Sequence, residues 1–518
     1  MKHLLAIVFT LVVCLPLGGV YAQVTKLKAS PAQERTIELI NYFVQRYHYR
    51  PARLNDELSS RILDRFVKHL DANRSYFLAS DIQRFEQMRF RIDDDLRLFQ
   101  LEGIFNVFDV YRERVAGRSE FVEEALVRGF QFDIDENYQF DRTDARWAVD
   151  STELNDIWRK RIKNEFLVLK VAGQSKKQIL KMLGGRYRQL NQRTSQLTAE
   201  NVFETFVNAY LSAVEPRTSY FSPGALSPAV EVSPSDLGIG AVLQTRDEHT
   251  VVQQVVAGGP AEISGQLHSG DRIIGVGQDT KTPMINVIGW RLDDVVKIIR
   301  GDEGTSVSLE ILPRNQPPGG LKRIISIVRS PIGPRLQVSQ KSILDFMIAN
   351  KNIRIGLIRI PTFYIDFEGR SSGKPDYQSA TRDVRRLIST LEADKIDGLI
   401  LDLRGNGGGA LTEGMSLTGL FIESGPTFQV KDAKGKIRAK NDPSPDIEYS
   451  GPLLVVVDRD TAGSSEILAG AIQDYRRGLI VGEPTFGLGT VGNIVDLNRY
   501  ARSSEEKLGQ MKFTIAEL

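Results

Sequence analysis

Residues 454–492, LVVVDRDTAGSSEILAGAIQDYRRGLIVGEPTFGLGTVG, decide how the C-terminal part of this chain folds. The apolar, β-branched run 453–457 predicts a buried strand, and a helix is expected from Ser464, at the carboxyl end of that strand. The buried face of this helix is expected to consist of Ile467, Leu468, Ala471 and Ile472. Residues 478–482 predict another strand, which gives the order strand, helix, strand.

The preceding hundred residues repeat this alternation. Residues 353–360 and 398–403 (GLILDL) predict buried strands, and an apolar stripe within 384–391 predicts a helix between them. The second strand runs into the glycine-rich turn RGNGGG, 404–409. This turn has neither the P-loop pattern nor the dinucleotide-binding spacing, which argues against a nucleotide site. Residues 331–518 therefore predict an α/β domain.

These motifs carry a family resemblance. SSEI at 464–467, GEPTFG at 482–487 and LRGNGGGALTE at 403–413 resemble the tail-specific (carboxy-terminal-processing) proteases of peptidase family S41. In that family S-A-S-E-I is followed by G-E-x-T-F-G-K-G-x-V-Q. Without gaps, its serine nucleophile falls on Gly463, its lysine base on Leu488 and the glutamine that orients the lysine on Gly492. The resemblance implies a crotonase/ClpP-like peptidase core.

The two positions that the resemblance assigns to nucleophile and base lack the groups that the reaction needs. A serine hydroxyl is a weak nucleophile until a base takes its proton, and a lysine can be that base when burial leaves its amine neutral. Gly463 has no hydroxyl group and Leu488 has no lone pair. We therefore expect the Ser-Lys dyad to be absent and the chain to be catalytically impaired.

Ser464 and Ser465 are the possible substitutes for the nucleophile. A shift of one residue at a helix start turns a side chain by about 100°, away from a substrate held for the original position. The base is harder to replace, because no histidine follows His268 and no lysine lies between Lys440 and Lys507. A Ser-His-Asp triad within this domain is thereby excluded.

Other positions retain the residue types of the family. The resemblance implies that Glu466, Asp474 and Thr485 are supporting residues, although the caps and buried hydrogen bonds of any core use the same types. It also implies an oxyanion hole of backbone N–H groups at Gly408 and Gly409, completed by the N–H of residue 464. No His/Cys/Asp cluster has ligand spacing, so we expect no metal and no organic cofactor.

Residues 226–330 resemble a PDZ domain, through GGPA at 258–261 followed by GDRI at 270–273. Its peptide-binding loop is expected at Leu237, Gly238, Ile239 and Gly240. In PDZ domains such a loop directs backbone N–H groups at a peptide's terminal carboxylate, and the following strand pairs with the peptide. Val295 and Val296 are candidates to contact the last side chain of the peptide, with core packing as the alternative. Residues 316–350 are expected to form a hairpin, a final strand and an exit linker.

Residues 23–225 predict a helical domain. Ser30-Pro31-Ala32-Gln33 has the pattern of a capping box with proline in the first turn. Amphipathic stretches follow at 55–70, 78–115, 151–172, 175–192 and 199–214. EPRTSYFSP (215–223) resembles D-P-H-T-x-Y-L-S-P of the same family. The fold class expected is thus multidomain α+β: a helical N-terminal domain, a β-rich PDZ domain and an α/β peptidase core.

The N-terminus indicates export. Residues 1–22 combine Lys2, a short apolar run and small residues up to Ala22, which predicts a secretory signal peptide and a bacterial periplasmic location. Cys14 is the only cysteine, so no disulfide is expected. No later apolar run reaches about 18 residues, so no stable membrane span is expected after signal removal. The formal net charge of +2 argues against nucleic acid as a partner.

Three functions remain open from the sequence. The first is an impaired homologue that binds protein or peptide C-termini, with an envelope adaptor protein as a further candidate partner. The second is an active S41 serine endopeptidase that uses a relocated Ser464 or Ser465. The third is a non-functional truncated remnant, because family members continue past the strand matching 510–515. On that reading the core is incomplete at its C-terminal end and leaves an unpaired edge or exposed apolar surface.

Overall fold

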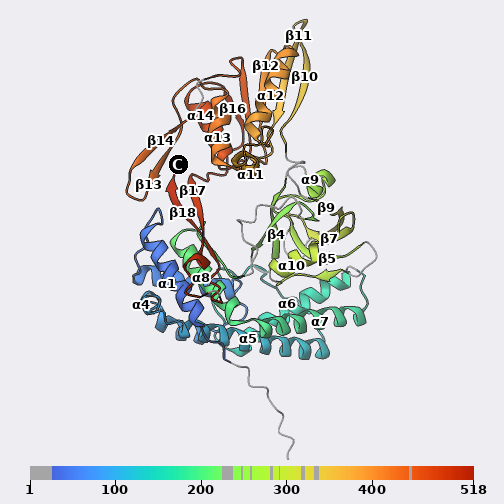
Figure 1. Cartoon of the computed structure of the whole chain (residues 1–518). Coiled ribbons are helices and arrows are strands. Elements are labelled where there is room, and N and C mark those ends of the chain that lie inside the picture. The colour runs from blue at the N-terminus through green and yellow to red at the C-terminus, as the bar shows by residue number, and fades with distance from the viewer. Residues whose placement is uncertain are drawn as a thin grey trace, which may run out of the picture.

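The computed structural model describes residues 26–171, 173–223, 237–246, 249–256, 259–279, 284–290, 292–316, 321–331, 338–442, 446–503 and 505–518. The predicted signal peptide and Cys14 lie outside these residues. In this part of the chain no helix is both long enough and apolar enough to cross a membrane. Figure 1 shows a helical base, a PDZ domain and a peptidase core that extends away from the base.

The helical domain is built from α1 to α8 and a short 3₁₀ turn. Their bounds are α1 Pro31–Arg46, α2 Asp56–Leu70, α3 Ala79–Phe85, η1 Glu86–Met88, α4 Ile92–Leu98, α5 Glu102–Arg128, α6 Ser151–Val171, α7 Lys176–Gln196 and α8 Ala199–Val214. The capping box at Ser30 is confirmed: its hydroxyl accepts from the N–H of Gln33, whose side chain accepts from the N–H of Ser30. The amphipathic stretch 78–115 is not one helix, because α4 ends at Phe99 in a left-handed conformation, φ +58°.

The PDZ domain forms a sheet in the order β3-β4-β5-β7-β8, with β6 beside β5. The strands are β3 Ala241–Arg246, β4 His249–Val255, β5 Arg272–Gly277, β6 Ile285–Asn286, β7 Ser306–Leu312 and β8 Arg323–Val328. Helices α9 (Pro260–Ser264) and α10 (Leu292–Ile299) complete it, and β2 (Leu237–Gly238) pairs with β9 (Ser330–Pro331). The expected boundary at 330/331 therefore falls inside β9.

The peptidase core contains a sheet in the order β10-β11-β12-β15-β16. The bounds are β10 Gln340–Ile348, β11 Lys351–Arg359, β12 Gly398–Asp402, β15 Leu453–Val457 and β16 Leu479–Gly482. Strands β11, β12, β15 and β16 are parallel, and β10 is antiparallel to β11. The prediction of an exit linker up to residue 350 was wrong for residues 340–348, because these residues form β10, an edge strand of the peptidase sheet.

Helices pack against one face of this sheet. They are α12 (Ala380–Ala393), α13 (Leu411–Gly419) and α14 (Ser464–Asp474), and the short helix α11 (Phe367–Ser371) precedes α12 in the chain. Leu391 of α12 and Leu468 of α14 share a buried cluster with Leu399 and Leu401 of β12. This cluster anchors the start of α14 next to the end of β15, where the candidate catalytic residues lie.

The end of the chain joins the core to the helical base. Strands β17 (Thr490–Asp496) and β18 (Gln510–Glu517), with η3 (Leu497–Tyr500) between them, run from the core down to α1 and α8 (Figure 1). Strand β18 also pairs with β1 (Ser219–Phe221) and with β13 (Pro426–Asp432), which itself pairs with β14 (Ile437–Asn441). Met511 and Phe513 are buried in the cluster of the helical domain. The last strand therefore packs against two domains.

Candidate active site

Gly463 lies between β15 and α14, as its N-cap residue, with φ +59° and ψ −118°. Positive φ costs free energy for any residue with a side chain, so glycine suits this place. Its N–H donates to Oε2 of Glu466 at 2.9 Å. The first turn of the helix is thereby held by the third residue of the same helix.

Glu466 connects both candidate catalytic positions. Besides the N–H of Gly463, its carboxylate accepts from the N–H of Leu488 at 3.0 Å and the N–H of Gly487 at 2.7 Å. It also accepts from the hydroxyl of Thr485 at 2.8 Å. One carboxylate thus holds the helix start and the 485–488 loop together, and the supporting role of Glu466 and Thr485 in the family's reaction stays a prediction.

Gly463 and Leu488 meet across this arrangement. A Cβ atom placed on Gly463 would stand 3.3 Å from Cδ2 of Leu488, its nearest neighbour. Leu488 is half-buried. The structure therefore brings together the two positions that the sequence alignment assigned to nucleophile and base, and it fills the space between them with apolar carbon.

The two neighbouring serines are buried donors. Ser464 is 3% exposed, and its hydroxyl donates to the carbonyl oxygens of Gly409 and Ala410 at 3.1 and 3.3 Å. Ser465 is fully buried, and its hydroxyl donates to the carbonyl oxygen of Asn406 at 3.0 Å. Both hydroxyl groups point into the glycine-rich loop, and neither faces Leu488.

The glycine-rich loop packs against the start of α14. A Cβ on Gly408 would stand 2.9 Å from the carbonyl oxygen of Ala462, and one on Gly409 2.4 Å from that of Phe363. Only glycine fits at such approaches. The N–H of Gly408 donates to Oδ1 of Asn406 at 2.9 Å, which leaves the N–H groups of Gly409 and Ser464 as the candidate oxyanion donors.

Asn406 was missed in the sequence analysis. It is fully buried, and its Nδ2 donates to the carbonyl oxygen of Ile360 at the end of β11. Its own carbonyl oxygen accepts from the N–H of Ala462 and from the hydroxyl of Ser465. A lone amide residue among the four glycines of 405–409 was the local signal of this role.

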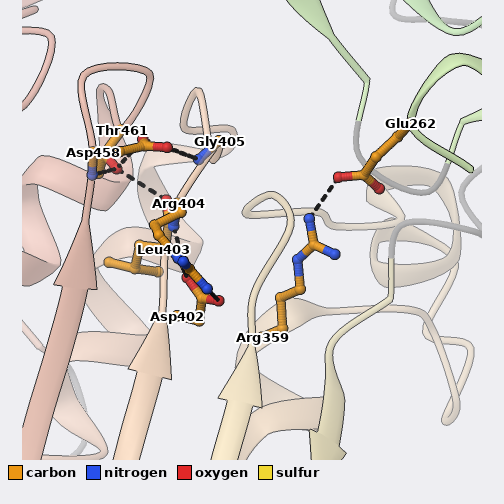
Figure 2. Close-up of polar contacts among 8 residues, drawn as sticks. All are labelled: Glu262, Arg359, Asp402, Leu403, Arg404, Gly405, Asp458 and Thr461. Atoms are coloured by element: carbon orange, nitrogen blue, oxygen red, sulfur yellow. Dashed lines mark hydrogen bonds and ion pairs between the residues drawn. The ribbon is translucent and has the colours of Figure 1, made fainter. Parts of the chain in front are cut away.

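A second polar network fixes the loop to β15 (Figure 2). The N–H of Gly405 donates to both carboxylate oxygens of Asp458, at 3.0 and 3.1 Å, and Thr461 donates to the carbonyl oxygen of Leu403. Burial opposes ionisation of Asp402, but hydrogen bonds from Arg404 at 2.9 and 2.7 Å hold its pKa below the ordinary value. The ends of β12 and β15 are thus tied rigidly beside Gly463.

Two predicted positions lie outside the site. Within 4 Å of a Cβ on Gly492 the structure places Cε of Lys512 and the carbonyl oxygen of Phe513, so Gly492 does not contact Leu488 there. Asp474 is exposed at the far end of α14, about 15 Å from Gly463 by helix geometry. Asp474 is therefore a surface residue of the helix in this structure.

Arg217 was the second residue missed. It comes from the EPRTSYFSP motif before β1, and its guanidinium donates to the carbonyl oxygens of Leu488 and Gly487. It also donates to the hydroxyl of Thr490 at 3.0 Å and lies 6.0 Å from the ring centroid of Phe486. The helical domain thus fixes the loop that carries Leu488 from the side opposite Glu466.

The PDZ groove is bounded by an edge strand and a helix. Strand β3 ends the sheet, and α10 lies beside it. Gly240 has φ +69°, and a Cβ atom placed on it would stand 3.0 Å from Cα of Gly259, the residue before α9. The loop 237–240 therefore packs tightly against the start of α9. Val295 is fully buried in the PDZ core, as is Ile239 at 3% exposure, whereas Val296 is half-buried.

The PDZ domain contacts both neighbouring domains. Glu262 of α9 accepts from Arg359 at the end of β11, at 2.6 Å (Figure 2). The guanidinium of Arg193 in α7 stacks on Trp290, 3.1 Å from the ring centroid. The PDZ domain is thus connected to the core at the end of β11, beside the ends of β12 and β15.

Comparison with known families matches all three domains. Residues 40–224 match the tail specific protease N-terminal domain, residues 229–312 the PDZ domain and residues 354–517 peptidase family S41. The chain is 37% identical over 470 residues to the tail-specific protease of Haemophilus influenzae, which covers 90% of this chain and 65% of that protein. It is 29% identical over 288 residues to carboxy-terminal processing protease CtpA of Bacillus subtilis, covering 55% and 54%.

A solved structure of the PDZ domain of the carboxy-terminal protease from Vibrio cholerae, in complex with peptide, is 49% identical. It covers 18% of this chain and 93% of that one, with a TM-score of 0.17. This chain spans less than two thirds of the length of the two curated relatives. By its three domains and its sequence, the chain belongs to the tail-specific proteases of peptidase family S41.

Proposed function

We propose that this chain binds the C-termini of polypeptides through its PDZ domain and does not cleave them with a Ser-Lys dyad. The observation that carries the proposal is the pair Gly463 and Leu488: a Cβ atom placed on Gly463 would stand 3.3 Å from Cδ2 of Leu488. Acyl transfer by this family's chemistry needs a hydroxyl and a neutral amine at that contact. A hydrogen atom and an isobutyl group supply neither.

The hydrogen bonds around the pair support the view that the site keeps the family's backbone arrangement. Glu466 still holds both sides, and Gly409 still presents its backbone beside the start of α14. Ser464 and Ser465 are poor substitutes for the nucleophile, since each hydroxyl is buried and donates to a carbonyl oxygen. Freeing either hydroxyl would leave that carbonyl oxygen without its donor and require the helix start to turn.

The PDZ domain supports C-terminus binding. Strand β3 is an edge strand and can accept an extended peptide by strand addition, and the 237–240 loop before it packs closely on the start of α9, where its backbone N–H groups can meet a carboxylate. Half-buried Val296 is better placed than buried Val295 to meet an apolar last side chain. The ligands expected are protein C-termini with apolar last residues in the bacterial periplasm, delivered directly or by an envelope adaptor protein.

Two measurements test the two halves of this proposal. Titration with a fluorescent peptide should show binding when its C-terminus is free and a loss of binding when it is amidated. Incubation with a reporter bearing an apolar C-terminal tail should show no cleavage, and a serine-directed phosphonate probe should not label the chain. Cleavage that is abolished by Ser464→Ala or Ser465→Ala would contradict the second half and leave the first intact.

A further inference from the structure

His48 is fully buried where the helical domain meets the last strand of the chain. It follows α1, and its ring stacks on that of Phe513 in β18, with 6.4 Å between the ring centroids. Its own N–H donates to the carbonyl oxygen of Phe43, and the N–H of Tyr49 donates to that of Thr514 at 2.8 Å. The backbone on both sides of the ring therefore fixes it between α1 and β18.

The contacts of the two ring nitrogens suit the neutral form of His48. Nδ1 accepts from the N–H of Arg50 at 3.0 Å, so the proton of the neutral ring is on Nε2. Nε2 then donates to the hydroxyl of Thr218 at 3.0 Å, and this hydroxyl donates to Oε2 of Glu215, also at 3.0 Å. The hydroxyl of Thr514 donates to the same carboxylate oxygen. The neutral ring thus completes a chain of hydrogen bonds from Arg50 to Glu215.

This chain of hydrogen bonds lies directly beside Arg217. Thr218 is 2% exposed, follows Arg217 in the sequence, and donates its N–H to the carbonyl oxygen of Glu215 at 3.1 Å. Arg217 in turn donates to the carbonyl oxygens of Gly487 and Leu488, and we call these contacts the Arg217 clamp. Because neighbouring residues share a backbone, a displacement of Thr218 displaces the clamp.

A charged ring fits these contacts poorly. Protonated imidazole donates from both nitrogens, so the N–H of Arg50 loses its acceptor and Nδ1 keeps only the carbonyl oxygen of Arg50, at 2.9 Å. A buried charge also loses its hydration. The ring can regain water most directly on the Nε2 side, which Thr218 covers, because Nδ1 is bonded within its own turn.

The charged groups of the surrounding segments do not offset this loss. They are Arg46 at the end of α1, Arg50 two residues after the ring, Glu215 after α8, and Lys512 and Glu517 on β18. Arg46 lies over the ring of Tyr42, Lys512 beside Gly492, and Glu517 against the hydroxyl of Tyr49. Burial lowers the pKa of His48, and the opposing attraction of Glu215 is weaker.

We propose that His48 is a positioning residue for the loop that carries Leu488, and that protonation of its ring loosens the Arg217 clamp. Movement of residues 215–218 lets water reach Nε2 and restores the ordinary proton affinity of the ring, so acid favours the moved form. Below about pH 6.5, each pH unit multiplies the population of this form by up to about tenfold. The inference requires neither cleavage nor binding of a peptide by this chain.

Amide hydrogen exchange of the full chain at pH 7.5 and 5.5 tests the proposal, with each rate divided by that of an unstructured peptide at the same pH. The amide groups of Gly487 and Leu488, which donate to Glu466, should lose about tenfold of their protection at the lower pH. The amide groups of α14 should lose less than about twofold, because the change is local. In His48→Gln the loop should be equally protected at both pH values, whereas His268→Gln, which alters an exposed histidine of the PDZ domain, should keep the drop.

Two variants of Thr218 separate the hydroxyl from its packing. Thr218→Val keeps the shape of the side chain and removes the hydroxyl between His48 and Glu215, so loop protection should be low already at pH 7.5. Thr218→Ser keeps the hydroxyl and should behave like the unaltered chain. Comparison with α14 in the same sample distinguishes a loosened loop from a general loss of stability.

Three results would overturn the proposal. The first is loop protection in the unaltered chain that is the same at both pH values. The second is a drop that persists in His48→Gln or extends equally to α14. The third is the same loop protection in Thr218→Val and Thr218→Ser.

Discussion

Gly463 and Leu488 lie next to each other: a Cβ atom placed on the glycine would stand 3.3 Å from Cδ2 of the leucine. The carboxylate of Glu466 accepts from the backbone N–H of both residues, so their approach is a consequence of the helix cap and not of side-chain attraction. On the proposed assignment of these positions to nucleophile and base, the two backbones are close while a hydroxyl and an amine are missing from them.

The backbone at Gly463 predicts that a serine there is strained. At φ +59° and ψ −118° a residue with a Cβ atom costs on the order of 1–3 kcal/mol. We expect Gly463→Ser to lower the free energy of unfolding by about this amount in urea denaturation. Gly463→Ala should show the same loss, because the strain comes from Cβ and not from the hydroxyl. Unchanged stability in both variants would contradict the argument.

Rebuilding the dyad should require both residues. Gly463→Ser alone has no base, and Leu488→Lys alone has no nucleophile, so neither variant should cleave a tail-bearing reporter. The variant Gly463→Ser/Leu488→Lys should show measurable cleavage and labelling by a phosphonate probe. The matched control Gly463→Ala/Leu488→Lys should show neither. Activity in that control would place the nucleophile elsewhere.

Glu466 should contribute strongly to stability. Glu466→Gln keeps the shape but replaces one acceptor oxygen by an NH₂ group among the donors of Gly463, Thr485, Gly487 and Leu488. Losing charge-assisted bonds to donors that are partly buried or exposed should lower the free energy of unfolding by about 1–3 kcal/mol. Asp474→Asn, at the exposed end of the same helix, should change it by less than about 0.5 kcal/mol. Equal effects would argue against a holding role.

Arg217 should control the mobility of the 487–490 loop. Its guanidinium donates to Gly487, Leu488 and Thr490, and lysine cannot reproduce this fork. In Arg217→Lys we expect amide hydrogen exchange of the loop to become about tenfold faster, which corresponds to about 1.4 kcal/mol. Arg188→Lys, which disturbs an exposed pair with Glu123, should leave the loop unchanged. Exchange that is equally fast in both variants would refute the clamp.

Stability should fall as the pH drops below about 6.5. Burial lowers the pKa of His48, which contacts Thr218 through Nε2, and burial also lowers the pKa of His69. The unfolded chain then binds protons at a higher pH than the folded chain, so stability is greatest above the unfolded value and declines below it. Urea denaturation from pH 7.5 to 5.5 should show this slope. His48→Gln should reduce it, whereas substitution of the exposed His268 by glutamine should not.

Local patterns predicted most elements correctly. The capping box at Ser30, the strand ending in LDLR and the helix beginning at Ser464 all follow from residues close in sequence. The break at Phe99 was missed, because a phenylalanine in a left-handed conformation has no sequence signal of its own. Strand β10 was missed for another reason: apolar residues occur on both of its faces, so it lacks the polar-apolar alternation of a half-buried strand.

For the candidate site, too, residue types could be predicted from the sequence and contacts could not. Residue types alone place a glycine and a leucine at the two positions that the family resemblance assigns to nucleophile and base, and neither side chain can transfer a proton. The fold adds three facts: these residues lie close together, Glu466 and Arg217 bind their backbone from two domains, and the hydroxyl groups of Ser464 and Ser465 turn toward the glycine-rich loop. The physical reason is that residue type is a local property, whereas contact depends on backbone angles and on pairings between residues far apart in the chain.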